Sequence, residues 1–206
     1  MLNRHNLIEG YYKVVKAIVS HSPLAKMNPN SISFTASIIG VIAAIFFMFG
    51  HSATAGILLL FSGILDTLDG TVARLGERSS KFGATLDSSL DRYVEMFVFM
   101  GITYHFKDSP MFFWSFLAIM GSMMVSYIRA RAQSLGVQEL VGFMQRFERF
   151  IILSVGAILN PWGVSYFGSE IVLEISIIIL AIGTNYTAYQ RLMIVKKVED
   201  DSADPS

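Results

Sequence analysis

The chain has 206 residues, of which 53% are hydrophobic and only 16% are charged, and its mean hydropathy is +0.52. This composition is typical of an integral membrane protein, and the length suits one domain. The formal net charge is zero, which gives no indication of a nucleic-acid partner. The absence of cysteine excludes disulfide, iron–sulfur and thiol chemistry.

The segment 1–25 is predicted to lie along the membrane surface. Between residues 6 and 20 apolar side chains recur at helical spacing, while Lys13 and Lys16 fall elsewhere on the helix. This pattern indicates an interfacial amphipathic helix. The prolines that follow separate it from the first apolar run.

Six apolar runs of membrane-spanning length follow, bounded by polar residues, glycine or proline. We expect transmembrane helices at about 30–50, 53–75, 82–105, 110–132, 146–167 and 171–193. The predicted fold class is therefore all-α, a polytopic membrane protein with a six-helix bundle over residues 30–195. The bundle and the amphipathic helix form a single domain, 1–198, and the acidic tail 199–206 is expected to be disordered.

Basic residues predict the orientation of this bundle. Six spans place both termini on the same side as the connections between spans 2 and 3 and between spans 4 and 5. Of the 16 Lys and Arg residues, only Lys107 falls on the opposite side. By the positive-inside rule, both termini and these connections face the cytoplasm, in the cell membrane.

Four aspartates interrupt the second and third predicted spans. The second span ends in Asp66-x-x-Asp69-Gly70-x-x-Ala73-Arg74, and its five specified residues share one helix face. Ionisable residues at membrane depth cost roughly 2.5–3.5 kcal/mol each on the translocon scale, so a group of them implies a functional role.

The third span continues the pattern with Gly83-x-x-x-Asp87-x-x-x-Asp91, in which intervals of four align all three residues. Two helices joined by a short connection therefore direct four carboxylates and one guanidinium into a common cleft. Oxygen ligands without His or Cys suit Mg²⁺ or Mn²⁺, and these ions commonly hold phosphates. Glu95, one turn further along, is expected to support this site or to make an interhelical hydrogen bond.

The complete pattern, with eight residues between Arg74 and Gly83, resembles the signature of the CDP-alcohol phosphotransferase family at every specified position. The resemblance implies an enzyme that transfers a substituted phosphate group from a CDP-lipid to an alcohol and releases CMP. The donor would be CDP-diacylglycerol or CDP-archaeol, since apolar grooves accept either kind of chain. The family also implies two Mg²⁺ or Mn²⁺ ions per active site and a homodimer among membrane lipids.

The same resemblance assigns roles to individual residues. Asp66, Asp69 and Asp87 would bind a first ion, and Asp66, Asp87 and Asp91 would reach a second. Asp91 would also be the catalytic general base that deprotonates the acceptor hydroxyl. The residues implied to bind the CDP-lipid are Pro29, Asn30, Ser31, Ile32, Gly70, Ala73, Arg74, Ser80 and Gly83.

A second set of polar residues resembles one branch of this family. Ser-Tyr-Ile-Arg-Ala-Arg from residue 126, Arg-Phe-Glu-Arg from residue 146 and a late Gln-Arg-Leu are similar to enzymes that make phosphatidylinositol phosphate. Archaeal relatives of that branch make archaetidylinositol phosphate, and bacterial members carry lysine where Arg129 stands. The residues implied to hold the phosphate of inositol 1-phosphate are Ser126, Arg129, Arg131, Arg146, Arg149 and Arg191. The alternative role of these arginines is anchoring to lipid head groups.

Other functions remain open from the sequence. The acceptor could be glycerol 3-phosphate, serine or free inositol, and the donor could be CDP-inositol. A divalent-cation transporter also places acids on paired membrane helices, but it predicts acids distributed through the depth of the bilayer. Here they cluster at one end of the spans, and no inverted repeat is visible.

Overall fold

The structure, a computed structural model, describes residues 28–75, 80–137 and 142–203. This part of the chain is all-helical, which confirms the predicted fold class. The amphipathic helix predicted at 6–20 lies outside the described residues. The helices are α2 (Pro29–Met48), α3 (Ser52–Leu75), α4 (Lys81–His105), α5 (Met111–Ser134), α6 (Arg146–Phe167) and α7 (Ile171–Ala203).

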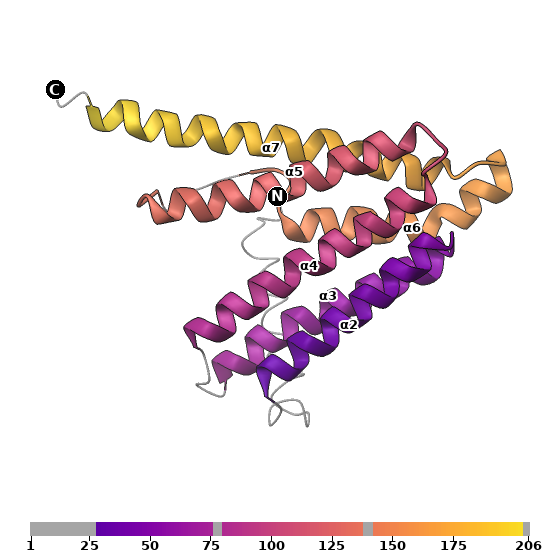
Figure 1. Ribbon diagram of the computed structural model, residues 1–206, viewed down its shortest axis with the longest axis horizontal. Helices are drawn as coiled ribbons and strands as arrows, with labels where there is room; N and C mark the ends of the chain where they lie inside the picture. Colours follow the sequence, from indigo (N-terminus) through magenta and orange to yellow (C-terminus); the bar gives the residue numbers. More distant parts are fainter. Residues whose placement is uncertain (1–27, 76–79, 138–141, 204–206) are drawn as a thin grey trace, which may run out of the picture.

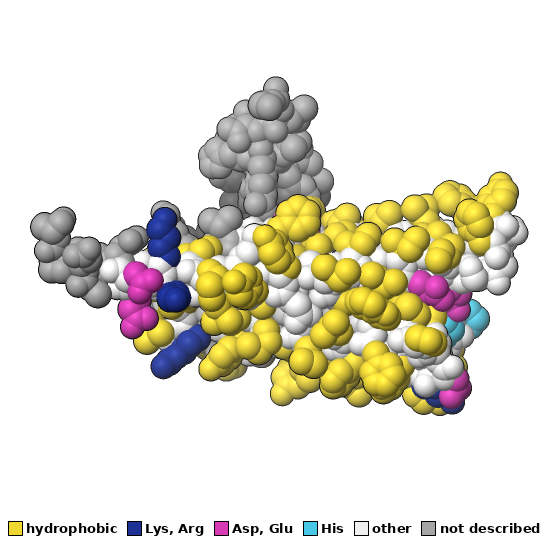
Figure 2. Space-filling view, turned by 90° about the horizontal axis from the view of Figure 1, so that it is seen from above, with side chains coloured by type: hydrophobic (Ala, Val, Ile, Leu, Met, Phe, Trp, Pro, Cys, Tyr) yellow, Lys and Arg dark blue, Asp and Glu magenta, His cyan; other side chains and the backbone are white. Residues whose placement is uncertain are grey.

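Five of these helices are long and apolar enough to cross a membrane: α2, α3, α5, α6 and α7. Helix α4 has 25 residues and is about 37 Å long, which is sufficient for a span, but it carries the acids Asp87, Asp91 and Glu95. Those charges lower the mean hydropathy of α4, so α4 is not among the five apolar helices. The predicted count of six spans requires α4 to cross the membrane together with the acids that it carries. Figure 2 shows a broad hydrophobic surface between charged groups near either end of the molecule, as expected for a protein embedded in lipid.

The helices form one antiparallel bundle (Figure 1). Helix α2 packs against α3 and α4, α3 packs against α6, and α7 packs against both α5 and α6. Small residues permit close helix contacts: a Cβ atom on Gly101 would lie 2.2 Å from the carbonyl oxygen of Ala44, and one on Gly121 would lie 2.1 Å from Thr184 Oγ1. Because successive helices alternate in direction, the ends of α3, α5 and α7 meet the beginnings of α4 and α6 at one end of the bundle.

A polar network joins the helices at the opposite end. His105 Nε2 lies 2.7 Å from Glu170 Oε1, and Asn160 Nδ2 donates to Glu170 Oε2 at 3.0 Å. Asn160 Nδ2 also lies 3.1 Å from Ser52 Oγ, and its Oδ1 accepts from the backbone N–H of Leu173. The network therefore connects α3, α4, α6 and the start of α7.

Helix α7 is longer than predicted. It continues past the predicted end of the last span and reaches Ala203, within the tail that we expected to be disordered. The reason is that no glycine or proline interrupts the chain between Gly183 and Pro205, so nothing breaks the helix where the apolar sequence ends.

Candidate active site

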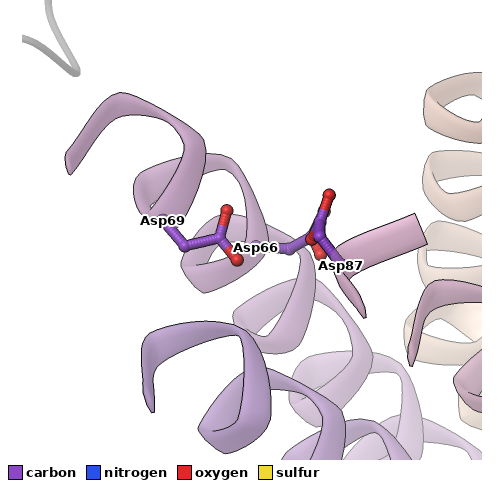
Figure 3. Close-up of side chains that lie close together, drawn as sticks. All are labelled: Asp66, Asp69 and Asp87. Carbon is purple, nitrogen blue, oxygen red and sulfur yellow. The ribbon is translucent and has the colours of Figure 1, made fainter. Parts of the chain in front are cut away.

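Three carboxylates meet where α3 ends and α4 begins. Asp66 and Asp69 come from α3 and Asp87 from α4, and one carboxylate oxygen of each lies within 4.8 Å of the others (Figure 3). Oxygen ligands on opposite sides of an octahedral Mg²⁺ lie about 4.2 Å apart, so small side-chain rotations would close this group around an ion. Carboxylates without His or Cys are the ligands that Mg²⁺ and Mn²⁺ prefer. These residues therefore fit the predicted metal.

Helix α2 supports this group through Ser33. The Ser33 hydroxyl donates a hydrogen bond to Asp69 Oδ2, and both residues are buried. Such a bond fixes the orientation of a ligand carboxylate. Sequence reasoning missed Ser33. This residue lies one helical turn after Pro29, a predicted nucleotide contact, and on the same face of α2.

The fourth aspartate has a different neighbour. Asp91 follows Asp87 by one turn of α4, but its Oδ1 forms an ion pair with Arg146 Nη2, and the side chain of Asp91 is only 11% exposed. The other terminal nitrogen of Arg146, Nη1, pairs with Asp66 Oδ2. Arg146 was predicted to contact the acceptor phosphate, and the structure instead places it against two predicted metal ligands.

The predicted donor-binding residues lie on three helix ends. The Gly83 N–H donates to Ser80 Oγ at 2.9 Å, so Ser80 serves as the N-cap of α4. A Cβ atom on Gly83 would lie 3.3 Å from Asn30 Oδ1, which places the start of α4 beside the start of α2. Gly70 and Ala73 are half-buried on α3, and the side chain of Arg74 lies outside the described residues. At the start of α2, Pro29 and Ile32 are buried and Ser31 is exposed.

Two of the predicted acceptor arginines are buried. The Arg149 side chain is 3% exposed, and its Nε and Nη2 lie 2.7 and 3.1 Å from the two carboxylate oxygens of Glu95. Arg191 is 2% exposed, and its Nη1 donates to the carbonyl of Val125 at 2.6 Å. Its Nε has no hydrogen-bond partner among the described residues.

The remaining acceptor candidates are closer to the surface. Arg129 and Arg131 are exposed near the end of α5, and the half-buried Ser126 donates to the carbonyl of Ser122. Arg191 lies within electrostatic range of Arg129 and Arg149. The structure therefore gathers three of the arginines, from α5, α6 and α7, at the end of the bundle that carries the aspartates.

Arg92 is a further residue that we did not single out as a site candidate. It is half-buried, within electrostatic range of Asp91, Glu95 and Arg146, and its Nη1 is buried without a hydrogen-bond partner among the described residues. The sequence could have indicated Arg92, because it stands between Asp91 and Glu95 in a predicted membrane span. A basic residue at that depth is costly unless it has a functional or electrostatic partner.

A helical membrane protein with an acidic divalent-cation site beside buried arginines has the features of an enzyme that acts on phosphate esters. Comparison with known proteins agrees: the profile of the CDP-alcohol phosphatidyltransferase family matches residues 26–187. The chain belongs to this family, and it is a transferase of substituted phosphate groups.

Named relatives lie in the predicted branch of the family. The chain is 35% identical over 168 residues to an archaetidylinositol phosphate synthase of Methanothermobacter thermautotrophicus, covering 80% of each chain. The structure is similar to that of Mycobacterium tuberculosis phosphatidylinositol phosphate synthase with CDP-DAG bound, at 28% identity and a TM-score of 0.77, covering 89% of this chain and 94% of that one. The same mycobacterial enzyme in complex with manganese and citrate has a TM-score of 0.78 at 27% identity, with 88% of both chains covered.

These comparisons confirm the predicted family, reaction class and choice of Mg²⁺ or Mn²⁺. The roles of individual residues stay predictions.

Proposed function

We propose that this protein transfers a phosphatidyl-type group from a CDP-lipid to a hydroxyl of inositol 1-phosphate, giving CMP and a phosphatidylinositol phosphate or its archaeol equivalent. The observation that supports this proposal most directly is the meeting of Asp66, Asp69 and Asp87 at the end of the bundle that also gathers buried arginines. Carboxylates there suit the metal-bound pyrophosphate of a donor, and guanidinium groups suit the phosphate of an acceptor.

The donor would bind where α2, α3 and α4 begin or end. Gly83 and Asn30 lie side by side there. The family resemblance implies that the small residues Gly70 and Ala73 let a nucleotide approach the backbone of α3 closely. Divalent ions held by the aspartates would neutralise the negative charge of the pyrophosphate. Asp91 would accept the proton of the acceptor hydroxyl. The hydroxyl oxygen would attack the lipid-bearing phosphorus, and the bond from that phosphorus to CMP would break.

The acceptor phosphate would bind near Arg191. This guanidinium is fixed by one hydrogen bond to α5, and its buried Nε has no partner among the described residues, so a phosphate oxygen that entered here would satisfy that donor without breaking the anchor. Arg129, in range of Arg191, adds positive charge at the same end of the bundle. A free polyol would gain far less from these charges.

The test is an acceptor panel. Purified protein would be given a radiolabelled CDP-lipid, Mg²⁺ or Mn²⁺, and one of inositol 1-phosphate, glycerol 3-phosphate, serine or free inositol, and CMP release would be recorded. We expect inositol 1-phosphate to give the highest kcat/KM. A higher value for another acceptor would overturn the choice of substrate and leave the family reaction intact. Diacylglycerol and archaeol donors compared in parallel would identify the lipid chain.

We propose further that the aspartates and both termini face the cytoplasm in the cell membrane. The positive-inside distribution supports this orientation, since Lys196 and Lys197 extend from the aspartate end of α7 while Lys107 lies at the other end of the bundle. Because the chain has no cysteine, Lys196→Cys and Lys107→Cys can be labelled singly in intact cells. An impermeant maleimide should label only the Lys107→Cys variant, and labelling of Lys196→Cys instead would reverse the orientation.

The predicted homodimer also stays a proposal. An apolar groove of about 550 Å³ runs between α2, α4 and α5, lined by residues such as Ile45, Met100 and Phe116. Light scattering of the detergent-solubilised protein would measure its mass and so test the homodimer. A monomeric mass at micromolar concentration would contradict the homodimer.

A further inference from the structure

Arg146 occupies an unusual place for a cation. It is the first residue of α6, where the positive end of the helix dipole disfavours positive charge, and its N-cap, Gln145, makes no side-chain capping bond. Its guanidinium spans two other helices, with Nη1 on Asp66 Oδ2 of α3 and Nη2 on Asp91 Oδ1 of α4. The acids therefore hold Arg146 against an unfavourable local field.

The two carboxylates that Arg146 joins are not equivalent in the site. Asp66 belongs to the group of three that can surround an ion, whereas Asp91 does not belong to it in this arrangement. The second cation implied by the family resemblance would take oxygens from Asp66 and Asp91 as well as Asp87. The guanidinium already holds one oxygen of Asp66 and one of Asp91.

Electrostatics place the two occupants in competition. Buried carboxylates without a counter-charge are costly, so a cation is needed at this position whether or not metal is present. A guanidinium and a divalent ion bound to the same two carboxylates would lie within a few ångströms of one another and repel strongly. Asp69 differs, since it accepts a hydrogen bond from the neutral hydroxyl of Ser33.

We propose that Arg146 is an internal counter-ion that competes with a divalent cation for Asp66 and Asp91. In the metal-free protein its guanidinium neutralises these acids and holds α6 against α3 and α4. Binding of a cation at Asp66 and Asp91 displaces it and leaves it free to contact an anionic substrate group. This inference rests on the proposed function only in taking the aspartates as the metal site.

The decisive variant is Arg146→Gln, which removes the charge and keeps a polar side chain. Mn²⁺ would be titrated into EDTA-treated wild-type protein and the variant, and the free ion would be measured by electron paramagnetic resonance. Removing a competing charge-assisted contact should tighten the more weakly bound ion on the order of 10-fold or more. The melting temperature in EDTA should fall, and saturating Mn²⁺ should restore most of it.

A gain in metal affinity separates competition from a purely structural role, because damage to the site would weaken Mn²⁺ binding instead. Unchanged or weaker binding by Arg146→Gln overturns the inference. If that variant does not fold without metal, it is purified with Mn²⁺ and its affinity is measured by competition with a chelator of known affinity. Wild-type affinity in that measurement would overturn the inference equally.

The control is Lys196→Gln, an exposed residue of α7, which should match the wild type in both measurements. Failure of the wild-type protein to bind any Mn²⁺ would count against the metal site of the proposed function. Wild-type binding that Arg146→Gln does not tighten would reject the counter-ion role alone.

Discussion

Arg149 and Glu95 form a buried, two-pronged ion pair between α6 and α4. The Nε–Oε1 distance is 2.7 Å and the Nη2–Oε2 distance is 3.1 Å. Arg149 Nη1 also donates to the carbonyl of Met144 at 3.1 Å. All three groups of the guanidinium that can donate are therefore engaged within the protein, which makes Arg149 a structural link first and a substrate contact second.

The first prediction follows from this pair. Arg149→Met removes the ion-pair partner of Glu95 and leaves Arg92 and Arg146 as cations in electrostatic range of that carboxylate. Breaking a buried ion pair costs up to about 3–5 kcal/mol, so the melting temperature should fall by up to roughly 20 °C. The double variant Glu95→Gln, Arg149→Met should recover much of this loss, because the charge of Glu95 is removed together with that of its partner. Differential scanning fluorimetry measures both. As a control, Gln at the exposed Arg131 should change the melting temperature little.

A different outcome would restore the original assignment of Arg149. If Arg149→Met keeps the wild-type melting temperature and raises only the KM of the acceptor, its main role is phosphate binding.

The aspartates and the arginines differ in how well the sequence predicts them. Asp66, Asp69 and Asp87 occupy fixed positions on two helices joined by a short connection, so helical periodicity alone brings them together. Arg146 and Arg149 come from a helix more than fifty residues further along. Their partners depend on how α6 packs against α3 and α4, and periodicity contains no information on that packing.

The limits of the helices are likewise predicted well in most places and poorly in one. The glycine, proline and polar breaks predict where the spans begin and end to within a few residues. The apolar signal nevertheless ends before helix α7 does, because Lys196, Lys197 and the acids that follow are compatible with a helix in water. Apolarity therefore predicts the membrane-embedded part of a helix rather than its whole length.

A second prediction tests the metal group. The carboxylate oxygens of Asp66, Asp69 and Asp87 lie within 4.8 Å of one another, and Asp87→Asn replaces one of these three ligands with a weaker, neutral amide. The affinity for Mn²⁺ and the release of CMP at ordinary Mg²⁺ should therefore both fall strongly. The melting temperature in EDTA should stay near the wild-type value, because no charged partner is left buried. Asp200→Asn, on the exposed end of α7, is the matched control. Normal CMP release by Asp87→Asn would refute the assignment.

A third prediction concerns pH at the opposite end of the bundle. The hydrogen bond from His105 lowers the pKa of Glu170 below its ordinary value of 4.5, and the positive charge of His105 and a hydrogen bond from Asn160 act in the same direction against partial burial. A carboxyl whose folded pKa is depressed stabilises the fold above its unfolded pKa, and this contribution is lost as pH falls through the folded value.

Melting temperatures of the wild type and Glu170→Gln, recorded between about pH 6 and pH 3, measure that contribution. The wild type should be the more stable near pH 6, where imidazole carries a charge, and its advantage should shrink as pH falls below 4.5. A constant difference across this range would show that the ionised pair does not contribute.

A fourth prediction separates donor binding from chemistry. Asp91→Asn should lose far more turnover than affinity for the CDP-lipid. A general base acts only when the acceptor proton moves, whereas the group of three aspartates that can hold the first ion does not include Asp91. Donor affinity can be measured by fluorescence competition and turnover by CMP release. Equal losses in both would make Asp91 chiefly a metal ligand. The interpretation requires intact folding, which the melting temperature of Asp91→Asn in Mn²⁺ monitors.

The last prediction concerns the acceptor and Arg191. Arg191→Gln removes the charge and shortens the side chain, so its melting temperature is measured beside the affinities to separate the loss of the hydrogen bond to the Val125 carbonyl from the loss of the guanidinium charge. A charge-assisted hydrogen bond contributes roughly 1.5–3 kcal/mol, so the affinity for inositol 1-phosphate should fall on the order of 10- to 150-fold while donor affinity is spared. The loss should be confined to phosphorylated acceptors. Lys196→Gln, at an exposed position nearby along α7, should leave both affinities unchanged. If Arg191→Gln weakens donor and acceptor equally, or lowers only the melting temperature, the guanidinium supports the fold and the acceptor phosphate binds elsewhere.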